Sequence, residues 1–229
     1  MSQQPAPSQS PQSSQSSQSS QSAQSSQSPQ QPRTPAHTTG ESGLVVPYGE
    51  AGALPVLSLY EDFRCPYCAG LEHSAGAAIR RFADDGRLRL EYHFAALLDS
   101  MLGGRGSTTA LNAAGAALNE GQQDFKTLHE ALYAQQPDES VDSYGDPSVV
   151  LRVGESVGLV APAFREATIS GTYVPWAVSV AEAFGRSGVR GTPTVRLGET
   201  SIHGFDRAGR PLPGAEVTAQ IEAALGQSA

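Results

Sequence analysis

Apolar residues along the chain follow two patterns that together predict a mixed α/β domain. Residues 56–60 form an apolar run typical of a strand buried on both faces, near the centre of a sheet. Residues 88–94 alternate between apolar and polar side chains, as a half-exposed strand does. Short apolar runs at 44–46 and 194–197 predict two more strands, and residues 200–202 could pair with the last one as a hairpin.

Between these two groups of strands, residues 107–187 predict only helices. Their apolar side chains recur three and four positions apart, and glycine or proline separates one segment from the next. The expected helices span residues 108–119, 125–133, 147–157, 162–169 and 175–186. Helices at 66–82 and 213–225 complete the pattern. We therefore predict one domain over residues 43–229, with an all-helical insertion at about 107–187.

Residues 1–42 have a different composition from the rest of the chain. They are mostly Ser, Gln and Pro with almost no apolar side chain, so they cannot bury a core and are predicted to be a disordered tail. They lack the positive and apolar regions of a secretory signal, and no run in the chain is apolar enough to span a bilayer. We therefore expect no membrane segment and a cytoplasmic protein, or an extracytoplasmic one if the start site is misassigned.

The charge balance excludes two classes of partner. The net charge is −8 and the isoelectric point is about 5.1, with no cluster of basic side chains. Nucleic acids and anionic membrane surfaces both attract positively charged proteins. Neither is therefore an expected partner, and candidate chemistry has to be sought in particular side chains.

Two cysteines stand where the strand at 56–60 gives way to a helix. Cys65 and Cys68 are the only cysteines in the 229 residues, and two residues separate them. A cysteine at a helix N-terminus gains from unpaired backbone N–H groups and from the helix dipole, which stabilise its thiolate. Pro66 suits the first helical turn because it has no N–H group to leave unpaired. The spacing predicts a nucleophilic Cys65, with Cys68 able to close a small disulfide ring.

Three other roles for two cysteines compete with this redox interpretation. A structural disulfide across so short a loop adds little stability, and two inert buried thiols are also conceivable. A zinc site needs two further ligands, and no second Cys-x-x-Cys is present. The histidines are scattered, at His37, His73, His93, His129 and His203. His129 is predicted to lie at a helix surface or interface. The redox dithiol is favoured over all three alternatives, and no metal is expected.

The combination of motifs resembles the DsbA-like branch of the thioredoxin superfamily. The resemblance rests on Cys-x-x-Cys at a strand–helix junction, on the segment Gly-Val-Arg-Gly-Thr-Pro-Thr at 188–194, and on the helical stretch between them. Residues 125–133 are similar to one helix of that family's insertion. The resemblance covers about residues 44–225. It implies a thioredoxin-like α/β fold and a thiol–disulfide oxidoreductase.

Carried over to this sequence, the resemblance implies a role for each motif residue. Cys65 would attack and Cys68 would resolve the mixed disulfide. Pro193 would follow a cis peptide bond, leaving the backbone of Thr192 free to pair with an extended substrate. Asp62 would relay a proton to Cys68, or would simply be a polar strand-end residue. The partners would be protein thiols or disulfides and a thiol or redox partner that resets the couple. We expect a monomer without a cofactor.

The residues beside the cysteines leave other functions open. Pro66 and Tyr67 stand where the best-known periplasmic oxidases of the family carry Pro-His, and Pro-Tyr is the pair of glutaredoxins. Arg64, expected to be exposed, would lower the pKa of Cys65 only weakly because solvent screens its charge. One alternative is therefore a thiol-cofactor-dependent enzyme, glutaredoxin-like or glutathione-transferase-like, on the same scaffold. The other is a non-catalytic, redox-sensing binding module.

Overall fold

The computed structural model describes residues 1–2, 33–52 and 54–227 of the chain. The predicted disorder of the tail therefore falls largely outside the described residues. Residues 33–43, most of them assigned to the tail, lie on the folded domain. Thr39 forms a bridge with Val45, and the Ala36 N–H donates to Asn119 Oδ1 at 3.1 Å. Residues 33–43 thus contact the domain through backbone groups and through Pro35, whose side chain is buried near Gly115.

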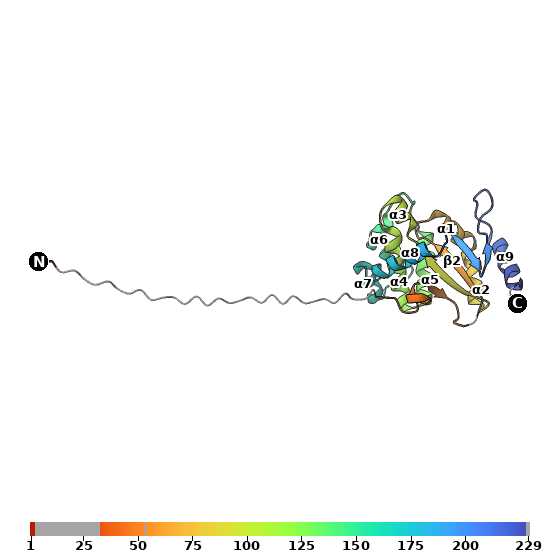
Figure 1. Ribbon diagram of the computed structural model, residues 1–229, viewed down its shortest axis with the longest axis horizontal. Coiled ribbons are helices and arrows are strands. Elements are labelled where there is room, and N and C mark those ends of the chain that lie inside the picture. The colour runs from red at the N-terminus through yellow and green to blue at the C-terminus, as the bar shows by residue number, and fades with distance from the viewer. Residues whose placement is uncertain (3–32, 53, 228–229) are drawn as a thin grey trace. The chain divides into compact units, whose positions relative to one another are not determined.

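A mixed five-stranded sheet forms the centre of the domain (Figure 1). Its order is β1-β3-β2-β4-β5, with β2 parallel to β3 and every other pair antiparallel. The strands are β1 (Val46–Tyr48), β2 (Val56–Glu61), β3 (Arg89–Phe94), β4 (Thr194–Leu197) and β5 (Thr200–Ile202). All five lie close to their predicted positions, and β2 occupies the centre as its apolar run predicts.

The two faces of the sheet differ in burial. Leu57, Leu59 and Glu61 point to the fully buried face of β2, whereas Tyr60 on the other face is only half-buried. On that second face Tyr60 stacks on His93, with ring centroids 4.6 Å apart, and meets the edge of Phe184. β2 is therefore fully buried on one face and partly buried on the other, where Tyr60 packs against a small cluster of Ala95, Phe184 and Val189.

One group of helices packs beside the strands. α1 (Pro66–Leu71), a π-helical turn (Glu72–Gly76) and α2 (Ala77–Asp84) form one nearly continuous helix after β2. α9 (Gly214–Gln227) packs against α2 on the same side. The predicted helix after Cys65 is thus present, with a π turn in its middle that periodicity does not reveal.

The second group fills the stretch between β3 and β4, which contains no strand from residue 95 to residue 193. Its helices are α3 (Leu97–Leu102), α4 (Gly106–Glu120), α5 (Gln122–Ala134), α6 (Pro147–Ser156), α7 (Pro162–Ser170) and α8 (Val174–Arg186). Figure 1 shows α3, α6 and α7 on the opposite side of the sheet from α9. α4 is buried along most of its length and packs against α5, α7 and α8. We call α3 to α8 the helical insertion.

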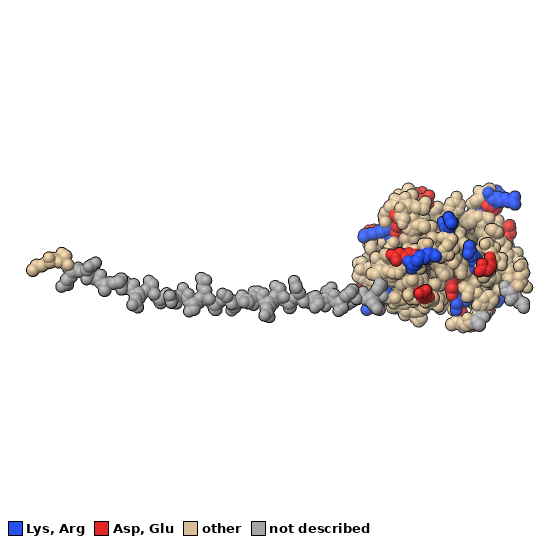
Figure 2. Space-filling model, viewed as in Figure 1, with Lys and Arg blue, Asp and Glu red and all other residues tan. Residues whose placement is uncertain are grey.

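The surface agrees with the charge balance. In the view of Figure 2, blue basic and red acidic side chains are interspersed over the domain, without a continuous basic area. Within the described residues, no helix is both long and apolar enough to cross a bilayer.

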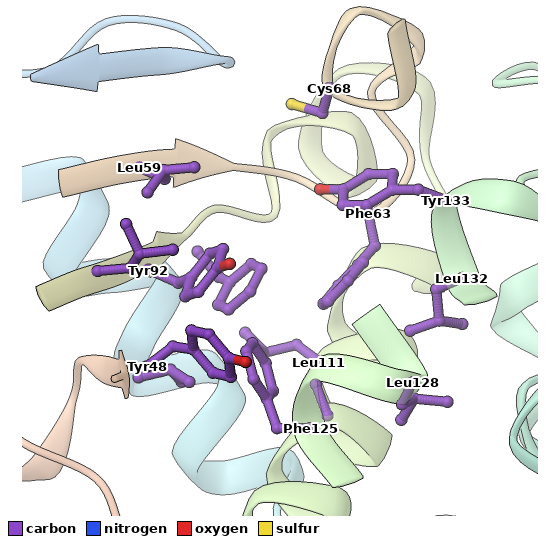
Figure 3. Close-up of a cluster of buried hydrophobic side chains, with 14 of the residues drawn as sticks. Tyr48, Leu59, Phe63, Cys68, Tyr92, Leu111, Phe125, Leu128, Leu132 and Tyr133 are labelled. Atoms are coloured by element: carbon purple, nitrogen blue, oxygen red, sulfur yellow. The ribbon is translucent and has the colours of Figure 1, made fainter. Parts of the chain in front are cut away.

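An aromatic cluster joins the sheet to the helical insertion near Cys68 (Figure 3). Phe63 stacks on Phe94 with ring centroids 4.8 Å apart, and Tyr92 meets the edge of Phe125 at 5.3 Å. Tyr133, from α5, packs on Phe63 at 5.4 Å. The cluster therefore connects the segment before Cys65 to α5.

Candidate active site

Cys65 and Cys68 occupy the first turn of α1, as the motif predicts. Cys65 is the N-cap residue, with φ −73° and ψ 117°, and Pro66 is the first helical residue. The Cys65 N–H donates to Asp62 O at 2.9 Å, which closes the turn between β2 and α1. Both thiols are reduced and lie within hydrogen-bond reach of each other. Cys65 is therefore nearly buried, with 5% of its surface exposed, whereas Cys68 is fully buried.

The two thiols have pKa values displaced in opposite directions. A hydrogen bond from Cys68 lowers the pKa of Cys65 to about 7, with further help from the backbone N–H groups of Cys68 and Tyr67 and against the effect of burial. Burial raises the pKa of Cys68 well above that of an ordinary thiol, and the charges of Cys65 and Glu61 raise it further. At neutral pH, Cys65 is thus partly a thiolate, whereas Cys68 holds its proton.

The segment before β4 lies directly against Cys65. The Thr192–Pro193 peptide bond is cis. Cys65 Sγ donates to Thr192 O at 3.4 Å, although 127 positions separate the two residues. Three features therefore meet at one sulfur: a helix N-terminus, a partner thiol and a backbone segment ending in a cis-proline.

The sequence model of a protein family described as thioredoxin matches residues 41–222. The chain belongs to this thioredoxin family. No curated protein matches it closely enough to add a named relative.

The solved structures of three proteins, MdbA, DsbA and DsbG, are similar to this chain. MdbA, a thiol-disulfide oxidoreductase from Actinomyces oris, has a TM-score of 0.68 at 23% identity, over 85% of this chain and 91% of that chain. DsbA from Mycobacterium tuberculosis has a TM-score of 0.60 at 25% identity, over 84% of this chain and 91% of that chain. DsbG from the same organism has a TM-score of 0.62 at 24% identity, over 85% of this chain and 84% of that chain. The predicted fold class, a DsbA-like thioredoxin domain with helices inserted, is confirmed, and the predicted enzyme class is that of these neighbours.

Tyr67 and the surface next to Pro193 form the open side of this thioredoxin-family site. Tyr67 is 57% exposed, and its ring meets the edge of Phe205 with centroids 5.5 Å apart. Beside it lies a depression of about 280 Å³ lined by Leu71, Pro193, His203 and Phe205, among others. The open side therefore presents both apolar and polar groups, and it adjoins the reactive sulfur.

Asp62 is buried, and both of its carboxylate oxygens accept hydrogen bonds. Oδ1 accepts from the Arg64 N–H at 2.9 Å and from Ser107 Oγ at 2.6 Å, and Oδ2 accepts from the Leu98 N–H at 3.1 Å. Burial raises the pKa of Asp62, while the three hydrogen bonds oppose that rise. Asp62 thus joins the active-site turn to the starts of α3 and α4, a connection that its position after a strand does not predict.

Arg64 lies buried, contrary to the prediction that it is exposed. Only 3% of its side chain is accessible, and its guanidinium contacts Asp99 Oδ1 at 3.0 Å and Asp142 Oδ1 at 3.3 Å. It also donates to Gly103 O and Glu139 O, at 2.8 and 3.0 Å. Two carboxylates therefore neutralise its charge, and the groups that lower the pKa of Cys65 lie elsewhere.

Glu61 and His129 form a buried pair that sequence reasoning missed. His129 Nε2 lies 2.8 Å from Glu61 Oε2, and each side chain is only 1% exposed. Of the two positions expected for His129, a helix surface or an interface, it occupies the interface between α5 and β3, inside the aromatic cluster, with Tyr92 at 4.9 Å and Tyr133 at 5.0 Å. Two signals could have revealed the pair: Glu61 is in phase with Leu57 and Leu59, and His129 shares a helix face with buried leucines.

Proposed function

We propose that the chain is a thiol–disulfide oxidoreductase that works through the Cys65–Cys68 pair. The observation that carries this proposal is the opposite displacement of the two thiol pKa values, with the low one at the helix N-terminus. A thiolate available near pH 7 is the nucleophile that disulfide exchange requires. The buried Cys68 thiol keeps its proton at first, so it suits the second step, in which it resolves the mixed disulfide.

In the reducing direction, the Cys65 thiolate attacks one sulfur of a substrate disulfide. A mixed disulfide forms at Cys65, and the other substrate sulfur leaves as a thiolate that takes a proton. Cys68 then loses its proton and attacks Cys65 Sγ, which closes the Cys65–Cys68 disulfide and releases the second substrate thiolate. Two electrons pass from the cysteine pair to the substrate, and the oxidising direction reverses each step. No cofactor besides the cysteine pair is needed.

We further propose that the substrate is a protein or peptide in an extended conformation. The depression beside Pro193, lined by apolar and polar side chains, and the exposed ring of Tyr67 offer contacts for a bound segment. Thr192 and Pro193 border the sulfur, where the substrate backbone would run. Pro66 starts the helix that stabilises the thiolate, and Asp62 holds the turn between β2 and Cys65. A second thiol or redox protein would reset the couple.

The test compares Cys68→Ser with the wild type and with Cys65→Ser. Incubated with a protein disulfide substrate, Cys68→Ser should accumulate a mixed disulfide at Cys65, because the resolving sulfur is missing. Cys65→Ser should trap nothing and should lose all exchange activity. If Cys68→Ser instead keeps full turnover with glutathione, only one thiol is needed, and the thiol-cofactor-dependent alternative replaces the proposal. If the wild type exchanges no disulfide, the binding-module alternative replaces it.

The direction of electron flow follows from the reduction potential of the Cys65–Cys68 couple. It is measured by equilibrating the protein in graded thiol–disulfide buffers and counting free thiols. A potential of about −120 to −180 mV would mark a disulfide donor, which suits the extracytoplasmic location. One of about −230 to −270 mV would mark a reductase, which suits the cytoplasmic location.

A further inference from the structure

The hydroxyl group of Tyr133 is buried beside the active site without a hydrogen-bond partner. Tyr133 lies on α5, one turn after His129, and its side chain is almost fully inaccessible. Its hydroxyl makes no hydrogen bond to any residue that the structure describes. Two other buried tyrosines are satisfied: Tyr144 donates to Leu132 O at 2.6 Å and Tyr48 to Asp84 Oδ1 at 2.6 Å. A buried hydroxyl without a partner is costly, so its retention here calls for a reason.

The surroundings of this hydroxyl are those of the redox pair. Figure 3 shows the Tyr133 ring extending from α5 below Cys68 in this view, with the hydroxyl at the end away from α5. Burial raises the pKa of Tyr133 well above its usual value, and the charges of Glu61, Cys68, Asp62 and Cys65 raise it further. The phenol therefore stays protonated whenever the cysteines react. It is a hydrogen-bond donor close enough to the cysteines for their charges to act on it.

The group most in need of a donor is Cys68. It is fully buried, and its ionisation is disfavoured by burial and by the charges of Cys65 and Glu61. The resolving step of the proposed function nevertheless requires it to become a thiolate. We propose that the Tyr133 hydroxyl donates a hydrogen bond to Cys68 Sγ when that sulfur ionises, and so acts as a positioning residue for the resolving step. This inference rests on the proposed function.

The proton that Cys68 loses also needs a destination. Glu61 is the carboxylate whose charge acts on Cys68, and His129 Nε2 holds its Oε2 at 2.8 Å. In the proposed step the proton passes from Cys68 Sγ to the Glu61 carboxylate, so a negative charge moves from Glu61 to the sulfur and the net charge inside the protein is unchanged. The resulting thiolate is the anion that the Tyr133 hydroxyl stabilises. The proton returns when the disulfide is reduced again.

Several charged or titratable groups surround this step and would shape its pH dependence. Those facing Tyr133 or Cys68 are Glu61 from β2, Asp62 from the following turn, Cys65 from α1 and His129 from α5. Behind His129 lies Glu72, whose charge is balanced by Arg80 at 2.7 Å. Two of these groups, the Tyr133 hydroxyl and His129 Nδ1, are buried without a hydrogen-bond partner among the described residues. The hydroxyl is the neutral donor of the two that keeps its proton throughout, because burial and the nearby charges hold the pKa of the phenol high. Its removal should therefore change the ionisation of Cys68 without adding or removing a charge.

The experiment compares Tyr133→Phe with the wild type, and uses Tyr144→Phe as a matched control. Reduced protein is mixed with excess glutathione disulfide, quenched with acid at set times, and analysed by mass spectrometry. The first step appears as glutathione bound at Cys65, and the second as its loss when the Cys65–Cys68 disulfide closes. The rate of the second step is measured as a function of pH.

The expected effect follows from the strength of a hydrogen bond to an anion. Losing such a bond should raise the pKa of Cys68 by about one to two units. A more basic thiolate is also more nucleophilic, which offsets nearly half of the loss, so resolution near neutral pH should slow about 3-fold to 15-fold. The rising limb of the pH profile should move to higher pH. Tyr144→Phe should leave the second step unchanged, and Tyr133→Phe should be no less stable than the wild type, since it loses no existing hydrogen bond.

A second measurement reports the ionisation directly. In a Cys65→Ser background, the ultraviolet absorbance of the Cys68 thiolate is titrated with and without Tyr133→Phe. The added substitution should raise the pKa of Cys68 by about one unit or more. An unchanged pKa, or an unchanged pH profile for the second step, would overturn the role of Tyr133 while leaving the proposed function intact. If the wild type never closes the Cys65–Cys68 disulfide, it is the proposed function that fails.

Discussion

Replacing Arg64 with methionine separates two roles that a cation next to Cys65 could have. Methionine is of similar length but brings neither charge nor donors. The substitution removes the hydrogen bonds to Asp99 Oδ1, Gly103 O and Glu139 O and the 3.3 Å contact with Asp142. If Arg64 mainly holds structure together, stability should fall and the chemistry of Cys65 should persist. If it mainly polarises the thiol, the reverse should hold.

The size of the stability loss depends on how well the Asp99 and Asp142 carboxylates remain hydrogen-bonded once the guanidinium is gone. Removing one partner of a buried ion pair costs about 3–5 kcal/mol when the other charge is left uncompensated. Asp99 would keep donors from the backbone of Ser107 and Thr108, and Asp142 would keep those of Arg105 and Gly106. Because these donors still compensate both carboxylates, we expect a loss of about 3 kcal/mol, at the low end of that range.

Urea unfolding of the reduced protein measures that loss, and thiolate absorbance measures the pKa of Cys65. The pKa should stay near 7, because Cys68 and backbone N–H groups set it. Arg81→Ala is the control. This arginine is 80% exposed and its contact with Asp85 is long, at 3.9 Å, so stability should stay within about 0.5 kcal/mol of the wild type. A loss below about 1 kcal/mol for Arg64→Met, or a clear rise in the pKa of Cys65, would refute this reasoning.

Two further predictions concern the buried groups near the sulfurs. The pKa of Cys65 is lowered from 9.0 to about 7 on folding, so the stability it contributes is lost as pH falls through 7. The free energy of unfolding of the reduced protein should therefore rise by about 2 kcal/mol between pH 7 and pH 9. Urea unfolding of Cys65→Ser should show no such rise. His129→Leu leaves the buried Glu61 carboxylate without its partner and should cost about 3–5 kcal/mol; Glu61→Gln, which keeps an acceptor for His129, should cost clearly less by the same assay.

Local patterns predicted most of the secondary structure. The apolar run of β2 and the alternation in β3 each depend on a strand and its immediate neighbours, so they are visible without knowledge of the fold. The hairpin of β4 and β5 was signalled by the glycine at 198. The helix after Cys65 was likewise signalled by the break in pattern at the motif. These elements are fixed by interactions between residues close together in the chain.

The side chains around the sulfurs could not be placed in the same way. Arg64 is two residues from Asp62, yet its partners Asp99 and Asp142 lie 35 and 78 positions further on. His129 reaches Glu61 across 68 positions. Charged side chains are normally exposed unless paired, and a single sequence does not show which distant residues will pair. The wrong prediction for Arg64 and the failure to pair His129 with Glu61 both follow from assuming that no such partner exists.

These long-range partners have a common origin, which assigns a physical role to the helical insertion. His129 and Tyr133 come from α5. Ser107 comes from the start of α4, and Asp99 comes from α3. Each of the four side chains contacts or faces a residue between Glu61 and Cys68. Just after α5, Gln136 Nε2 donates to both Phe63 O and Cys65 O, at 2.8 and 3.1 Å. The turn that presents Cys65 is therefore held on its inner side almost entirely by the insertion. The thioredoxin sheet and α1 supply the thiolate, whereas the insertion holds the turn in position. If Tyr133 acts on Cys68 as we propose, changes in α5 should alter redox behaviour without touching either cysteine.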